Sequence, residues 1–215
     1  MKKAFFTLVL AFICLNWVMA QIPKMEVYEL SASADLIVTG KIKMLDSKSY
    51  TLEIEEVVAG EYTQPTVVVE KFHNTKTAKR WGKYVLSEGM MLWLKNDNGV
   101  YKIIGENGEG EKMYFNGDVY LDSRGGALKN TFGNHAPYPG SAIYAEKVNG
   151  KEFIAAVKDT KPCFGLEIEE KKSPEGEISV KRFAVKKLED KQYDQIRSNS
   201  WMHDNIIASG EKHYR

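Results

Sequence analysis

The chain has 215 residues, 30 of them lysine or arginine and 29 aspartate or glutamate, so its formal net charge is +1. Because a chain this close to neutrality has no overall attraction for polyanions, nucleic acid is excluded as an expected partner. Its two cysteines, Cys14 and Cys163, allow one disulfide at most, so stability has to come from a hydrophobic core. The length suits one ordinary domain, or one domain with an extension.

Residues 1–20 have the three parts of a cleavable secretory signal peptide. Lys2 and Lys3 supply the positive start, an apolar stretch from Ala4 to Val18 follows, and the segment ends in Val18-Met19-Ala20. The apolar stretch is shorter than the roughly 20 residues that cross a bilayer, so no membrane span is expected after cleavage near Ala20/Gln21. The mature chain is expected in a bacterial periplasm or outside the cell. It would carry 28 basic and 29 acidic residues, a net charge of −1.

Alternating apolar residues predict a series of short strands after Ser31. The strand-like runs occur at residues 36–44, 50–58, 66–72, 90–94 and 100–104. The first two form a hairpin, and Glu55 to Val58 breaks the alternation by one residue, as a bulge would. Asn98-Gly99 between the last two runs is a strong hairpin signal. Five short strands within about 70 residues favour a small curled barrel over an open sheet.

The rest of the chain is predicted to form a linker and an extension. One more strand is expected at 117–121, so that the barrel domain covers residues 21–122. Residues 123–148, which are rich in glycine, are expected to form an irregular linker. The extension, residues 149–215, is predicted to hold a helix at 151–158, a strand at 178–185 and one or two helices at 188–207, with Gly210 as a stop. The predicted fold class is α+β, an OB-fold-like antiparallel β-barrel with a C-terminal β/α extension.

The stretch Ala34-Asp35-Leu36-Ile37-Val38-Thr39-Gly40-Lys41, followed by Tyr50 to Val58, Ala59-Gly60 and Gly89 to Lys95, resembles the netrin-like, tissue-inhibitor-of-metalloproteinase-like modules. The resemblance covers roughly residues 31–104 and implies an OB-fold barrel. Inhibitors of that family bind the protease zinc through a disulfide-tethered N-terminal cysteine. Here the expected mature N-terminus is Gln21-Ile22-Pro23, with no cysteine near it. The resemblance therefore implies a fold relative without that inhibitory device, and fold alone does not establish function.

Residue patterns typical of catalysis are sparse. The chain has no Gly-x-Ser-x-Gly nucleophile elbow. Its histidines, which lack metal-binding spacing, are His73, His135, His203 and His213. Cys163 follows Pro162 in an apolar setting, which favours a buried and inert thiol; the alternatives are pairing with His135 or His203 and an intermolecular disulfide. We therefore predict no enzyme activity, no cofactor and no metal site.

One segment, Lys71 to Lys83, concentrates basic and aromatic side chains. The candidate ligand-binding residues in it are Lys71, His73, Lys76, Lys79, Arg80, Trp81 and Lys83. Such a loop between barrel strands could combine charge attraction with ring stacking on a sugar or a base. The alternative is a solvated loop whose Trp81 packs back onto the barrel.

The expected function is that of an exported, non-enzymatic binding protein. It would recognise an unknown protein or an envelope polymer through the loops of the barrel. One alternative is a protease-inhibitor-like protein. Another, of a different class, is a hydrolase whose active residues converge only in the fold.

Overall fold

The computed structural model describes residues 24–74, 79–80, 82–122, 128, 135–137, 139, 144–172 and 178–214. The described chain divides into two units, the larger made of Lys24–Ile168 and Arg182–Arg215, the smaller including the described residues of Glu169–Lys181. The predicted signal peptide lies outside the described residues. In the part of the chain that the structure describes, no helix combines the length and the apolar character needed to cross a bilayer.

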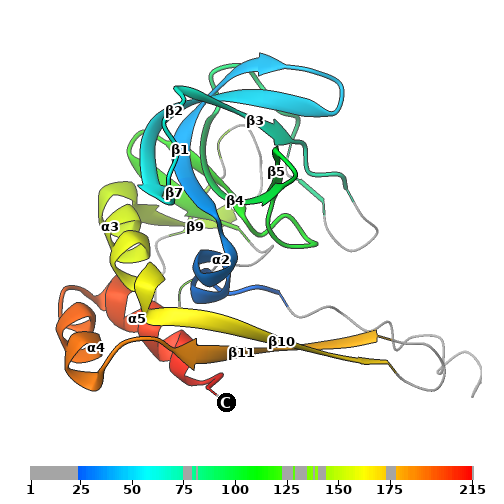
Figure 1. Cartoon of the computed structure of the whole chain (residues 1–215). Coiled ribbons are helices and arrows are strands. Elements are labelled where there is room, and N and C mark those ends of the chain that lie inside the picture. The colour runs from blue at the N-terminus through cyan, green and yellow to red at the C-terminus, as the bar shows by residue number, and fades with distance from the viewer. Residues whose placement is uncertain are drawn as a thin grey trace, which may run out of the picture. The chain divides into compact units, whose positions relative to one another are not determined.

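Five strands of the larger unit close into a barrel. They are, in spatial order, β1 (Leu36–Leu45), β2 (Ser49–Ala59), β3 (Thr66–Glu70), β5 (Val100–Ile103) and β4 (Gly89–Asp97), and β4 pairs with β1 to complete the ring (Figure 1). Neighbours are antiparallel except β3 and β5, where Val69 pairs with Tyr101 in parallel. A closed ring with an odd number of strands cannot alternate in direction throughout, so the barrel is mixed and not wholly antiparallel as predicted. The predicted α+β class with a barrel is confirmed.

The bulge predicted in the second strand is present. The register of β1 against β2 shifts between Thr39 and Gly40, whose partners are Glu56 and Ile54, so that Glu55 is skipped. Gly40 makes the close approach of the strands possible, because a Cβ atom at this position would lie 2.1 Å from the carbonyl oxygen of Glu53. The extra residue bends β2 and increases its twist, which helps a short sheet to close on itself.

Four further strands extend the sheet beyond β4. In spatial order they are β6 (Glu111–Phe115), β7 (Asp118–Leu121), β9 (Tyr144–Asn149) and β8 (His135–Pro137). The strand predicted at 117–121 is confirmed as β7. In contrast, β8 and nearly all of β9 lie in the segment expected to be an irregular linker. In β9 the two buried residues, Ala145 and Val148, are three positions apart and flank the charged pair Glu146-Lys147, so the sequence shows no period-two alternation there. The sheet therefore continues past residue 122.

Helices and a hairpin make up the rest of the described chain. The elements are α2 (Val27–Ser33), α3 (Gly150–Thr160), the 3-10 turn η1 (Lys161–Cys163), β10 (Phe164–Lys172), β11 (Ile178–Lys186), α4 (Asp190–Arg197) and α5 (Trp201–Glu211). The predicted helices and the strand at 178–185 are confirmed, whereas α2 and β10 were not expected. Gly210 lies inside α5 and does not stop it. A Cβ there would lie 2.4 Å from the ring of Phe164, so this glycine makes room for that ring.

One hydrophobic core joins the barrel to the helices. Ile37 of β1 and Trp93 of β4 pack with Leu30 of α2, Phe153 of α3 and Ile206 of α5, while the neighbouring residues of both strands face the barrel interior. Because both faces of β4 are buried, residues 90–94 form an unbroken apolar run instead of an alternating one. Within the larger unit, the predicted extension therefore shares its core with the barrel.

Candidate functional site

The structure divides the predicted basic loop between surface and interior. Lys76 and Trp81 lie outside the described residues. His73, Lys79 and Lys83 are exposed. Lys71 is half-buried, with its Nζ atom 5.8 Å from the centre of the Tyr84 ring.

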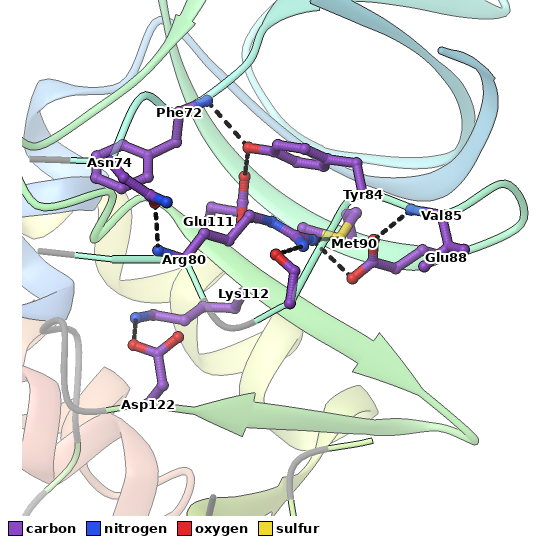
Figure 2. A network of polar contacts seen from close by, with 11 residues as sticks. Phe72, Asn74, Arg80, Tyr84, Val85, Glu88, Met90, Glu111, Lys112 and Asp122 are labelled. Atoms are coloured by element: carbon purple, nitrogen blue, oxygen red, sulfur yellow. Dashed lines mark hydrogen bonds and ion pairs between the residues drawn. The ribbon is translucent and has the colours of Figure 1, made fainter. Parts of the chain in front are cut away.

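Arg80 is buried, contrary to the expectation of a basic side chain at the loop surface. Its Nε donates to Glu111 Oε1 at 2.6 Å, its Nη2 to Glu88 Oε1 at 2.7 Å and its Nη1 to the carbonyl oxygen of Gly82 at 3.3 Å (Figure 2). The exposed fractions of the Arg80, Glu88 and Glu111 side chains are 3%, 6% and 0%. The guanidinium carbon lies 3.8 Å from the centre of the Tyr84 ring. Two buried carboxylates thus share one guanidinium.

The electrostatics of this group keep Arg80 charged and Tyr84 neutral. Burial alone would lower the pKa of Arg80, but Glu111 and Glu88 outweigh it and hold the pKa above its ordinary value. Burial, followed by the charge of Glu111, raises the pKa of Tyr84. The Tyr84 hydroxyl donates to Glu111 Oε2 at 2.6 Å and accepts the backbone N–H of Phe72 at 3.0 Å. We call Arg80, Tyr84, Glu88 and Glu111 the Arg80 clamp.

The Arg80 clamp holds both ends of the segment 82–89, because Arg80 donates to the Gly82 carbonyl at its start and to Glu88 near its end. Glu88 Oε2 accepts the backbone N–H of Val85 at 3.2 Å. The backbone of Ser87 donates to the Ile42 carbonyl at 2.8 Å, and Ile42 donates to the Glu88 carbonyl at 3.0 Å. The loop before β4 is therefore attached to β1 by backbone hydrogen bonds and to β6 through Arg80 and Glu111.

A second buried ion pair lies on the other face of β6. Lys112 Nζ is 3.3 Å from Asp122 Oδ1, and neither side chain is exposed (Figure 2). Glu111 and Lys112 are adjacent in a strand and so point to opposite faces, each toward a buried partner. This arrangement explains why β6 was not predicted, since its first two residues are charged yet buried.

A pocket of about 390 Å³ opens between segment 82–89 and β6. Its lining includes Lys83, Val85, Leu86 and Glu88 from the segment and Met113 and Phe115 from β6. Val85, Leu86 and Phe115 are 60%, 59% and 46% exposed, which is high for large apolar residues. Sequence reasoning missed all three. The signal was an apolar Val85-Leu86 pair in the turn before β4, where polar residues are the norm.

A hydrogen-bond chain with the residue types of a hydrolase triad connects α3 and α5. Ser200 Oγ lies 2.8 Å from His203 Nδ1, and His203 Nε2 lies 3.2 Å from Asp159 Oδ2. Ser200 is the N-cap of α5 and also accepts the backbone N–H of His203 at 3.5 Å, and the His203 side chain is only 6% exposed. A nucleophilic oxygen has to be open to its substrate, whereas this one caps a helix. This hydrogen-bond chain therefore attaches α5 to α3.

Cys163 is buried, as predicted from its apolar setting. Burial, together with the nearby Asp159, raises the pKa of its thiol to about 11, and its Sγ lies 3.9 Å from the Asp159 carbonyl oxygen. We expect a disulfide reagent such as 5,5′-dithiobis(2-nitrobenzoate) to react at pH 8 at least about 100-fold faster after unfolding in guanidinium, because the thiolate is the reactive form. Similar rates for the folded and unfolded chain would show that the thiol is accessible.

The described ranges contain no group of three or more His, Cys, Asp and Glu side chains that could hold a metal ion. The side chain of His135, one of the histidines considered as a partner for Cys163, lies outside the described residues. No protein-family model, curated protein or solved structure matches the chain.

Proposed function

We propose that the mature chain is an exported binding protein that holds an apolar group of its ligand in the pocket between segment 82–89 and β6. The observation that carries this proposal is the gathering of exposed Val85, Leu86 and Phe115 around that pocket. Exposed apolar residues that cluster beside a concave surface mark binding sites more often than scattered ones do. The volume of about 390 Å³ lies within the usual range for ligand pockets, about 300 to 1,000 Å³.

The Arg80 clamp supports this role because it fixes the pocket walls before a ligand arrives. Glu88, which lines the pocket, is bonded to Arg80 and to the Val85 backbone. A pocket whose walls are already ordered loses little conformational entropy on binding, so that more of the contact energy contributes to affinity. Loops held on a rigid barrel are a common place for such sites.

The two alternative functions place different demands on the same chain. An inhibitor-like protein, suggested by the netrin-like resemblance, would insert the loop before β4 into a protease cleft. A hydrolase would need an open nucleophile. Ser200 Oγ instead accepts a backbone N–H as the N-cap of α5, and Cys163 is buried. The binding role therefore has the more direct support.

The proposal is tested with the uncharged fluorescent probe N-phenyl-1-naphthylamine, whose emission rises in an apolar environment. The wild-type mature chain should give a saturable increase. The double variant Leu86→Ser/Phe115→Ser should bind about tenfold more weakly, because two partly exposed apolar side chains are removed from the contact. Both residues are exposed, so the variant should fold.

The matched control is Met44→Ser/Val68→Ser, which removes two apolar residues that are 60% and 56% exposed on β1 and β3. Its probe affinity should equal that of the wild type. An unsaturable signal, or an equal loss in both double variants, would show that the pocket is not a preferred apolar site.

A further inference from the structure

Lys83 is the pocket-lining charge whose side chain has no partner among the described residues. The other charged residue of the lining, Glu88, has both carboxylate oxygens occupied, Oε1 by Arg80 at 2.7 Å and Oε2 by the Val85 N–H at 3.2 Å. Lys83 is exposed, and no residue within the described ranges forms an ion pair or a hydrogen bond with its side chain. The pocket therefore combines an apolar surface with one available cation.

We propose that the ligand is an amphiphilic carboxylate, an apolar chain with a single anionic end. The chain would lie against Leu86, Met113 and Phe115, and the carboxylate would face the ammonium group of Lys83. This inference rests on the proposed function and names the ligand class of the same pocket. A lysine suits this task because its ammonium group is a compact charge that adapts to an anion without requiring a fixed planar geometry.

The buried carboxylates do not reverse this preference. Glu88 and Glu111 carry two negative charges, and Arg80 offsets one of them. The remaining negative charge would favour a cationic ligand if the carboxylates were open to solvent. Their side chains are only 6% and 0% exposed, and Arg80, Tyr84 and the Val85 backbone occupy their oxygens. The charge that a ligand meets at the pocket surface is that of Lys83.

The experiment compares three probes that share one chain and differ only in the charge of the end group: decanoate, decanamide and decylammonium. Each is titrated calorimetrically, below its aggregation threshold and at low salt, into the wild-type mature chain. Decanoate should bind about threefold to fivefold more tightly than decanamide, the factor expected for one exposed ion pair. Decylammonium should bind most weakly, and the differences should shrink as salt is added.

Variants of Lys83 separate the charge from the apolar contact. Lys83→Gln should make decanoate and decanamide equivalent, and Lys83→Glu should make decylammonium the preferred probe. Lys79→Gln, which removes an exposed lysine outside the pocket lining, should keep the wild-type order. Both positions, Lys79 and Lys83, are exposed, so all three variants should melt at the wild-type temperature.

The remaining outcomes separate the anionic ligand class from the proposed function. Equal binding of the three probes, unaffected by Lys83, would overturn the anionic ligand class and leave the apolar pocket standing. A preference of the wild type for decylammonium, or an equal effect of Lys79→Gln and Lys83→Gln, would also overturn it. Failure of all three probes together with the uncharged naphthylamine would overturn the proposed function itself.

Discussion

Replacing Arg80 by alanine should lower the free energy of unfolding by about 3 to 5 kcal/mol, because it leaves two buried carboxylates without their cation. Glu111 and Glu88 would then be partly desolvated anions in a low-dielectric interior, with 0% and 6% of their side chains exposed. In a chain of this size the loss corresponds to a drop in melting temperature of about 10 °C. Urea denaturation at pH 7, followed by far-UV circular dichroism, measures it.

Two further substitutions show whether the ionic contacts cause the loss. Lys79→Ala, one residue earlier and exposed, should change stability by less than about 0.5 kcal/mol. The double variant Arg80→Met/Glu111→Gln should lose about 1 to 3 kcal/mol less unfolding free energy than the two single variants lose together. The reason is that Glu111→Gln removes the buried carboxylate that Arg80→Met leaves without a cation. If Arg80→Ala were as mild as Lys79→Ala, the clamp would not be a buried network.

Replacing Trp93 by alanine should cost a similar amount, about 3 to 5 kcal/mol, because it empties a large volume from a fully buried position. The indole packs edge-on against Phe153 of α3, with ring centres 6.3 Å apart, and its N–H donates to Ser31 Oγ of α2 at 3.2 Å. One side chain of a barrel strand thus contacts two helices. Unfolding of the variant should remain a single transition, because β1 and β4 place side chains both in the barrel interior and in the cluster that they share with the helices.

Thermal melts followed by circular dichroism and by tyrosine fluorescence test this prediction. Trp93→Phe should lose less than Trp93→Ala, since a ring still fills most of the space. Val100→Ala, a truncation on β5 at a position 48% exposed, should have little effect. Separate transitions for barrel and helices, or an intact barrel after the helices unfold, would contradict the shared core.

Much of the barrel was predictable because strand periodicity is local. The strands β1 and β2, the bulge at Glu55 and the Asn98-Gly99 turn each depend on neighbouring residues, and each of these predictions is confirmed. The predicted alternation of β1 is not, because Leu36 to Gly40 are all buried and Met44 is 60% exposed. The strand predictions failed where charged residues are buried, because a sequence pattern assigns charged residues to the surface. Glu111 and Lys112 begin β6 with two charges that are buried only because Arg80 and Asp122 lie opposite them.

The candidate site could be placed only in part. The segment Lys71 to Lys83 leads into the pocket region, and Lys83 lines the pocket. Sequence reasoning could not separate Arg80 from Lys79, because two adjacent basic residues in a loop look alike until their partners are known. It also missed Phe115, whose exposure depends on the position of β6 in the sheet.

By itself the sequence determined the positions of the barrel strands, the hairpin turns, the helix of residues 151–158 and the near-zero net charge, since these follow from residue type and local spacing. Only the tertiary structure decided which charges are buried, which apolar residues stay exposed and which segments meet. Arg80 and Glu111 are 31 positions apart, and Trp93 and Ser31 are 62 apart. Contacts over such distances depend on strand order and on the closure of the ring, and no local pattern specifies those.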